Sequence, residues 1–251
     1  TRHSTLFPYT TLFRSTISAL IPSNVLNGSG YRIRIVSSSP LTTGANNGSN
    51  ISISDCAFSF NLKVFIQGYY VGSSTMRATV NPVLYPTLCD TLTMELHNTV
   101  SPYALSYLSK GTINVTGNGS FLFPTAAIGQ QYYVVINHRN ALQTWSANPV
   151  SVSSGGSYDF TTAAGNAFGS NQIQVSPGVF AIYSGDISNG ISGGVADGQV
   201  NMADLNELQA FVTQFLNNYN YHDLNGDFSV ESLDYSLMEN NLNLNLVVKK
   251  P

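Results

Sequence analysis

The chain is short of charged residues, of cysteine and of long apolar runs, and each shortage excludes a class of protein. Of its 251 residues only 9% are charged, 10 basic and 13 acidic, whereas a typical globular domain carries about 25%. The basic residues form no cluster, so the sequence excludes the basic face that a nucleic-acid partner requires. No stretch of about 18 apolar residues occurs, so we expect no membrane span.

Uncharged polar residues and aromatic residues fill the place of the missing charges. The chain is 43% hydrophobic, holds 13 Phe and 14 Tyr, and has a formal net charge of -3. Disordered chains combine low hydrophobicity with high net charge, so we expect this chain to bury a core. Its length allows one large domain or two to three small ones.

The first 15 residues, TRHSTLFPYTTLFRS, do not read as part of a fold. They lack the charged start, apolar stretch and cleavage site of a signal peptide. They resemble translated sequencing-adapter sequence, so we exclude residues 1–15 as a non-native segment. We therefore expect the chain to be a fragment of a longer protein.

Only two cysteines are present, Cys56 and Cys89. In a secreted protein they could form one disulfide, whose loop of about 33 residues would stabilise the fold by roughly 3 to 4 kcal/mol. The alternative is two buried free thiols, and the sequence leaves both open.

Alternating patterns in the first two thirds of the chain predict β-strands. Residues 31–40 (YRIRIVSSSP) and 51–54 (ISIS) alternate large and polar side chains at a period of two, which is typical of strands with one buried face. We assign residues 16–55 to the last strands of a truncated immunoglobulin-like domain.

A string of short strand candidates follows, rich in Val, Ile, Tyr and Phe. They include residues 60–70, 91–98 and 131–139, and turn clusters such as residues 116–119 separate them. Short strands at this spacing favour an antiparallel immunoglobulin-like β-sandwich, which we place at residues 56–165. The predicted fold class is therefore mainly β.

The last part of the chain, residues 183–251, changes character. It holds nine of the thirteen acidic residues, while its basic residues are Lys249 and Lys250 at the very end. Two segments, residues 202–218 and 232–242, carry apolar residues at helical spacing. These apolar residues are Leu205, Leu208, Val212 and Phe215 in the first segment and Leu233 and Leu237 in the second.

An acidic loop precedes the second helical segment and has the spacing of a calcium-binding EF-hand loop. Calcium takes six to eight oxygen ligands, so a tightly turning loop must aim alternate side chains inward while a backbone carbonyl fills position seven. The apolar Val230 at position eight is expected to pack into the core. The predicted Ca2+ ligands of this loop are Asp223, Asn225, Asp227, the Ser229 carbonyl, Glu231 and Asp234.

The same pattern recurs 30 residues earlier, where Val200 matches Val230 and Asp204 matches Asp234. A seven-residue insertion within residues 187–196 would bring Asp186 to the first position. The predicted ligands of this first loop of the chain are Asp186, Asn189, Asp197, Gln199, Asn201 and Asp204. The alternative is that both acidic, glycine-rich turns only cap the helices that follow.

The pair of loops resembles the dockerin type I repeat, whose pattern D-x-N-x-D-G has Val at position eight and Asp at position twelve. Phe228 departs from it, because the family has glycine there. The stretch from residue 16 onward, including YRIRIVSSSP, VVINHRNALQTWSANPV and YSLMENN, looks like the C-terminal region of large secreted or cell-surface proteins of Bacteroidetes bacteria. The matching loop residues are Asp223, Asn225, Asp227, Val230 and Asp234.

The resemblance implies an extracellular or cell-surface location and a small α-helical, dockerin-like calcium-binding unit after the sandwich. We expect a non-enzymatic C-terminal module that binds two calcium ions and supports the presentation or attachment of a larger protein. One alternative is a true dockerin that binds a cohesin-type partner in polysaccharide degradation, or a module with a surface-polysaccharide partner. Another is an accessory part of a secreted hydrolase.

Two further patterns are weighed against these expectations. Residues 190–194 (GISGG) fit the serine-hydrolase motif G-x-S-x-G, with Asp204 and His222 following in order, but no strand–turn–helix pattern surrounds them. We interpret them as part of a polar insertion. Trp145, with Tyr132 and Tyr133, could form an aromatic sugar platform, but a single Trp in a β-sandwich usually fills the core.

Overall fold

A computed structural model describes residues 18–19, 21, 25, 28–53, 57–214 and 216–251. The chain divides into two compact units, Thr1–Asp55 and Cys56–Pro251. Within the described ranges, no helix combines the length and apolar character needed to cross a membrane.

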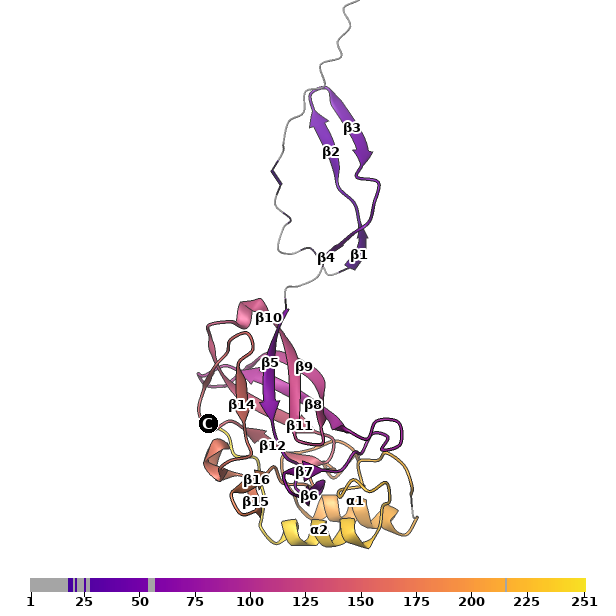
Figure 1. Cartoon of the computed structure of the whole chain (residues 1–251), viewed down its shortest axis with the longest axis vertical. Helices are drawn as coiled ribbons and strands as arrows, with labels where there is room; N and C mark the ends of the chain where they lie inside the picture. The colour runs from indigo at the N-terminus through magenta and orange to yellow at the C-terminus, as the bar shows by residue number, and fades with distance from the viewer. Residues whose placement is uncertain (1–17, 20, 22–24, 26–27, 54–56, 215) are drawn as a thin grey trace, which may run out of the picture. The chain divides into compact units, whose positions relative to one another are not determined.

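The first unit contains two short antiparallel strand pairs (Figure 1). Strand β1 (Gly28–Tyr31) pairs with β4 (Ile51–Ile53), and β2 (Arg34–Ser38) pairs with β3 (Leu41–Asn46). Strands β2 and β4 fall on the two segments whose alternation predicts them, whereas β3 lies between these segments and β1 overlaps the first only at Tyr31. Their assignment to a truncated immunoglobulin-like domain stays a prediction.

The second unit is built on one eight-stranded sheet (Figure 1). Its order is β12-β11-β8-β9-β10-β5-β14, with β13 also paired to β11. All neighbours are antiparallel except β14, which runs parallel to β5. The mainly β class is confirmed. The strands are β5 (Ala57–Lys63), β8 (Leu88–His97), β9 (Leu105–Asn114), β10 (Asn118–Pro124), β11 (Gln131–His138), β12 (Ala141–Trp145), β13 (Val150–Ser151) and β14 (Ser157–Asp159).

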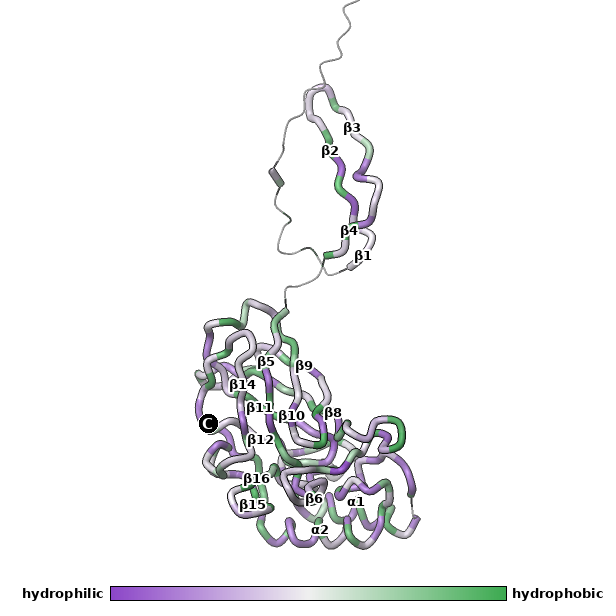
Figure 2. Tube along the Cα trace, viewed as in Figure 1, coloured by the Kyte–Doolittle hydropathy of each residue, from purple (hydrophilic) through white to green (hydrophobic). Residues whose placement is uncertain are grey.

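Period-two burial along the strands explains why the sheet forms a core. Every second residue of β5, and of β8 from Asp90 onward, is buried, because successive side chains of a strand point to opposite faces. Figure 2 shows hydrophobic and hydrophilic residues following one another along the chain. Phe60, Phe121 and Phe123 are among the largest buried side chains, and burying each contributes roughly 1.5–3 kcal/mol.

Short elements close the lower end of the sheet and carry the chain to two helices. Two strand pairs, β6 with β7 and β15 with β16, precede the helices. A second apolar cluster gathers around the helices and includes Leu142 from β12. The elements are β6 (Tyr70–Gly72), β7 (Thr75–Met76), β15 (Ile173–Ser176), β16 (Val179–Ala181), α1 (Met202–Val212) and α2 (Ser232–Leu242), with 3-10 turns at Thr125–Ala127, Ala164–Asn166 and Phe168–Ser170.

The helices occupy the predicted segments, but the buried face of α2 differs from the prediction. Leu205 and Leu208 of α1 are buried as expected, and Phe215 lies outside the described residues. Leu233 is 59% exposed, so its expected place in the core is wrong. Asp234 and Asn241 take the buried face with Met238, since both polar side chains hydrogen bond inward.

The structure describes only one of the two cysteines, so the predicted choice between a disulfide and two free thiols stays a prediction. Cys56 lies outside the described residues. Cys89 is fully buried in the core, where its thiol donates to Met76 Sδ at 3.9 Å. Burial raises the pKa of the Cys89 thiol strongly, so this sulfur is held in its neutral form.

Candidate calcium-binding loops

The loop before α2 is organised around the carboxylate of Asp234. Oδ1 of Asp234 accepts hydrogen bonds from the backbone N–H groups of Leu224 (2.7 Å) and Asn225 (3.0 Å). Oδ2 accepts from the N–H of Glu231 (2.9 Å). One buried side chain at position twelve thereby ties together positions two, three and nine.

The loop before α1 repeats this arrangement bond for bond. Oδ1 of Asp204 accepts from the N–H groups of Ile187 (2.7 Å) and Ser188 (2.8 Å), and Oδ2 accepts from Asn201 (2.8 Å). The 30-residue repeat predicted from sequence is therefore present in three dimensions. Val200 and Val230, at position eight of each loop, are buried in the same apolar cluster, as predicted.

The hydrogen bonds also locate the insertion in the first loop. Ile187 and Ser188 match Leu224 and Asn225, so the seven extra residues are 189–195, which lie inside the predicted range. A bridge between Ser188 and Gly193 closes them off. Ser188 thus occupies the third position, and the predicted ligand Asn189 lies within the insertion. The Asn189 amide oxygen instead accepts from the N–H groups of Ile191 and Ser192 within the insertion.

The first residue of each loop holds the turn from inside. Asp223 accepts from the N–H groups of Gly226 (2.7 Å), Asp227 (3.2 Å) and Phe228 (2.9 Å). Its counterpart Asp186 accepts from the N–H groups of Asp197 (3.0 Å) and Gly198 (3.0 Å). Both loops therefore wrap around a buried carboxylate at position one.

Position six of both loops has a left-handed backbone. Phe228 has a φ of 73°, and the matching Gly198 has a φ of 85°. A side chain in this region costs roughly 1–2 kcal/mol, and glycine avoids that cost. The expectation that Phe228 stands at a glycine position is confirmed.

The remaining predicted ligands lie at the rim of the loops. Asp227 accepts from the N–H of Ser229 and Asp197 from that of Gln199. The Ser229 hydroxyl donates to Asn217 at 3.0 Å. The Asn225 amide donates to Asp227 Oδ2 at 3.0 Å.

Helix capping, the alternative for these acids, is also realised. The side chains of Asn201 and Glu231 accept from the N–H groups of Ala203 and Leu233, and Asp204 completes the first capping box as Asp234 completes the second. Capping does not use every oxygen lone pair of a carboxylate, which can accept about four bonds. The same side chains can cap a helix and bind a cation.

Three observations bear on whether a cation fits. Glu231 Oε1 is buried without a hydrogen-bond partner among the described residues. Burial, with the negative charge of Asp223 adding to it, raises the pKa of Asp234 to about 7. Burial, with Asp204 and Asp197 adding to it, likewise raises the pKa of Asp186 to about 7. A bound cation would offset both costs, so the loops fit calcium electrostatically.

The acidic side chains alone do not make a metal cluster. In the part of the chain that the structure describes, no three His, Cys, Asp or Glu side chains gather closely enough to hold an ion. Calcium also takes amide and backbone carbonyl oxygens. A site in these loops therefore depends on Asn225 and on the carbonyl of Ser229 as well.

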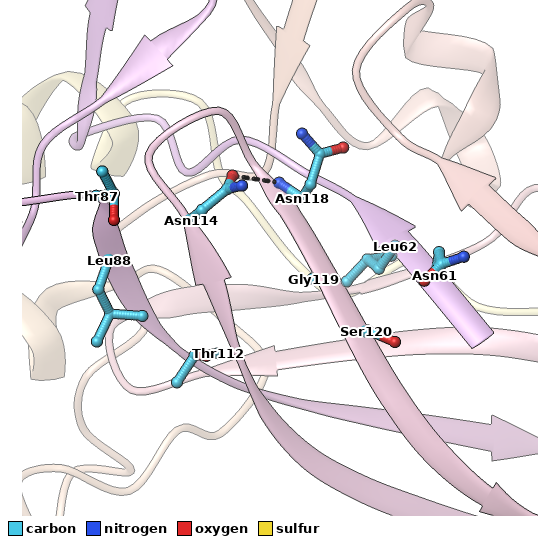
Figure 3. A pocket seen from close by; sticks show the side chains of 9 residues that line it. All are labelled: Asn61, Leu62, Thr87, Leu88, Thr112, Asn114, Asn118, Gly119 and Ser120. Atoms are coloured by element: carbon cyan, nitrogen blue, oxygen red, sulfur yellow. Dashed lines mark hydrogen bonds between the residues drawn. The ribbon is translucent and has the colours of Figure 1, made fainter. Parts of the chain in front are cut away.

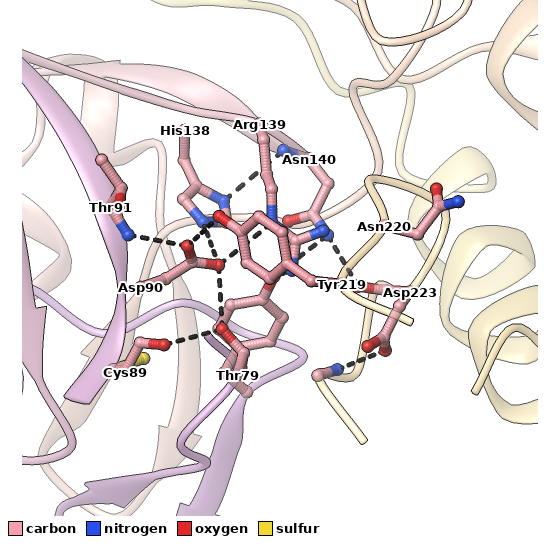
Figure 4. A network of polar contacts seen from close by, with 12 residues as sticks. Thr79, Cys89, Asp90, Thr91, His138, Arg139, Asn140, Tyr219, Asn220 and Asp223 are labelled. Atoms are coloured by element: carbon pink, nitrogen blue, oxygen red, sulfur yellow. Dashed lines mark hydrogen bonds and ion pairs between the residues drawn. The ribbon is translucent and has the colours of Figure 1, made fainter. Parts of the chain in front are cut away.

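The second loop packs directly against residues of the eight-stranded sheet and its connections. The Asn140 amide, just before β12, donates to the Asp223 carbonyl at 2.8 Å (Figure 4). A Cβ built on Gly68 would lie 1.9 Å from the Leu224 carbonyl oxygen, so only glycine fits there. Arg77 Nη1 lies 3.5 Å from Asp227 Oδ2.

A buried polar network that the sequence gives no sign of fixes the segment between the loops. Asp90 on β8 is fully buried, and its Oδ1 accepts from the Tyr219 hydroxyl at 2.5 Å (Figure 4). Its Oδ2 lies 3.1 Å from His138 Nε2 and 3.0 Å from Arg139 Nε. Burial alone would raise the pKa of Asp90, but His138, Arg139 and Tyr219 outweigh it and hold the pKa well below its usual range.

The serine-hydrolase pattern is not assembled. The Asp204 carboxylate accepts backbone N–H groups, and His222 Nε2 lies 3.0 Å from Glu207 Oε1. Ser192 is exposed within the insertion. Trp145 is 4% exposed, so its interpretation as a core residue is confirmed, and Tyr132 is also buried while Tyr133 is half-buried.

Comparison with known proteins gives little beyond this geometry. No family model matches the chain, and no curated protein matches it. Two crystal structures of the type II cohesin–X–dockerin complex from Acetivibrio cellulolyticus, one an N-terminal and one a C-terminal interface mutant, are similar at 18% and 17% identity. Each match covers 77% of this chain and 96% of that chain, with TM-scores of 0.44 and 0.43. These scores carry no argument about function, which therefore rests on the chain's own residues.

Proposed function

We propose that this protein is a non-enzymatic, extracellular or cell-surface module whose two C-terminal loops bind structural calcium. The observation that supports this most strongly is the repeated hydrogen-bond pattern around Asp204 and Asp234. Each copy of the loop has acids at positions one, five and twelve and bends around buried carboxylates. Calcium-binding loops of the EF-hand type place acids at these positions.

Each loop would supply side-chain and carbonyl oxygens, and calcium would supply the positive charge that the buried acids lack. In the first loop we propose Ser188 at the third position, in place of the predicted ligand Asn189. The loops would then present a pair of folded helices for the attachment or presentation of a larger protein. The proposed ligands are Asp223, Asn225, Asp227, Ser229, Glu231 and Asp234 in one loop, and Asp186, Ser188, Asp197, Gln199, Asn201 and Asp204 in the other.

The test is a calorimetric calcium titration of chelator-treated protein and of two variants, Asp204→Asn and Asp234→Asn. Each variant should lose one of two binding events, because it removes the charge at position twelve of one loop. Glu239→Gln is the matched control, since Glu239 is an exposed acid on α2 outside the loops. Unchanged titrations in both variants would refute the proposal.

A second candidate function is docking of a cohesin-type partner at the starts of the helices. Met202 and Leu233 are 55% and 59% exposed at the first turns of α1 and α2. Exposed apolar residues in the first turn of both helices, Met202 at its first position and Leu233 at its second, favour a binding surface. Co-elution with a purified type II cohesin, lost in the double variant Met202→Ser and Leu233→Ser, tests this candidate.

A further inference from the structure

A hollow of about 310 Å³ lies on the sheet beside the segment that joins the two loops. Strands β8, β9 and β11 supply its floor, and Tyr219 supplies one wall. Its polar lining is Thr91, Thr93, Lys110, Asn137, His138, Arg139 and Tyr219. None of the proposed calcium ligands lines it.

Tyr219 is held rigidly at this hollow. Its hydroxyl donates to the buried carboxylate of Asp90 at 2.5 Å (Figure 4). The Arg139 guanidinium lies 4.1 Å from the centre of its ring. The residue nevertheless remains 42% exposed, so a fixed aromatic ring borders the hollow and is partly open to solvent.

The hollow carries positive charge. Arg139 is neutralised through its Nε contact with Asp90 (3.0 Å), and its Nη1 is buried without a hydrogen-bond partner among the described residues, so Lys110 supplies the accessible charge. Lys110 is exposed and forms no ion pair within the described ranges. An anionic group on a ligand would therefore be attracted here.

Hydroxyl groups line the floor in a row. Thr91 and Thr93 lie two residues apart on β8, so their side chains share one face of the sheet. The side-chain amide of Gln143 donates to Asn137 Oδ1 at 2.8 Å and so fixes the Asn137 side chain. These groups can exchange hydrogen bonds with a hydroxyl-bearing ligand.

We propose that this hollow binds an acidic sugar residue of a polysaccharide. The ring of Tyr219 would contact the apolar face of the sugar, Lys110 would pair with its carboxylate, and Thr91 and Thr93 would bond its hydroxyls. This assignment goes beyond the proposed calcium function, because none of these side chains belongs to the loops.

An acidic peptide is the competing ligand, and the fold disfavours it. Strand β8 is paired on both sides, with β9 and β11, so its backbone offers no free edge to a peptide strand. A sugar needs aromatic, hydroxyl and charged side chains but no backbone edge.

A second hollow serves as an internal comparison. It measures about 600 Å³ and is lined by neutral residues, among them Asn61, Asn114, Asn118 and Thr112 (Figure 3). No charged side chain is in its lining. It could not distinguish an acidic sugar from a neutral one, so Asn118→Ala is a control for binding outside the proposed site.

The test is calorimetric titration of the calcium-loaded chain with a galacturonic acid trimer and with a neutral galactose trimer. The acidic trimer should bind more tightly, and added salt should weaken it. Lys110→Gln should weaken the acidic trimer by about tenfold, equivalent to about 1.4 kcal/mol. Tyr219→Ala should weaken both trimers, whereas Lys250→Gln and Asn118→Ala should change neither.

Three results would overturn the assignment: equal binding of both trimers, unchanged binding by Lys110→Gln, or equally tight binding of a tri-aspartate peptide. Thermal melts of each variant show whether a loss of binding reflects unfolding. Because Lys110 lies far from the loops in sequence and touches none of their ligands, its variant should keep calcium binding. Failure of this site is thus separable from failure of the calcium proposal.

Discussion

At the scale of single residues, the two loops differ in the residue that makes the turn at position six. Position six needs a left-handed backbone, and the first loop meets this need with Gly198 while the second uses Phe228. The spacing of the acids allowed this position to be identified from the sequence, because loop numbering fixes which residue makes the turn. The left-handed φ of Phe228 therefore strains the backbone of the second loop.

Replacing Phe228 with glycine should therefore strengthen calcium binding. Relief of roughly 1–2 kcal/mol of backbone strain corresponds to about a tenfold gain, since 1.4 kcal/mol is one decade. Calorimetric titration of both proteins measures it. Gly198→Ala is the mirror control and should weaken the first site. Weaker binding by Phe228→Gly would show that the half-buried ring contributes more by packing than the turn costs.

At the scale of elements, sequence patterns located strands and helices but not how they face one another. Short runs rich in Val, Ile, Tyr and Phe located parts of β5, β8 and β11, because these residues fill the core that the strands share. The helical spacing of Leu233 gave a wrong prediction of the buried face of α2. Asp234 and Asn241 occupy that face instead, because their side chains hydrogen bond inward. Asp90 and Tyr219 are 129 residues apart, and no local pattern could pair them.

The contact between the second loop and the sheet unit should be sensitive to a single methyl group at Gly68. Gly68→Ala would place a Cβ 1.9 Å from the Leu224 carbonyl oxygen and 2.7 Å from Leu237 Cδ2. Overpacking of this kind typically costs about 1–3 kcal/mol. Denaturant unfolding should show that loss, with weaker calcium binding at the second loop. Gly165→Ala, which has nothing within 4 Å, should have neither effect.

At the scale of the whole molecule, the helices and the sheet of Cys56–Pro251 form one compact unit. Asn140 shows the coupling: its amide donates to the Asp223 carbonyl, and its own carbonyl accepts from the N–H of Gly185, beside Asp186. Composition alone suggested a separate C-terminal unit, because the acidic residues cluster there. Shared packing, which composition does not report, joins the two parts.

Calcium removal should therefore be felt in the sheet. Trp145 is the single tryptophan and lies in β12, so its fluorescence follows sheet unfolding. Calcium at about 100 times Kd contributes about 2.7 kcal/mol per site, or about 5.4 kcal/mol for two sites. Each kcal/mol shifts Tm by roughly 2–4 °C at this size, so chelation should lower the Trp145 transition by about 10–20 °C. A transition that does not move with chelator would show that the sheet folds independently of the loops.

The most direct test of the central claim is native mass spectrometry of the chain, first stripped with chelator and then returned to calcium. The account predicts two bound calcium ions per chain, one in Asp234→Asn, one in Asp204→Asn and none in the double variant. Two ions should remain in Glu239→Gln. A chain that takes up no calcium, or that binds two ions in the double variant, would contradict the assignment of calcium to these loops.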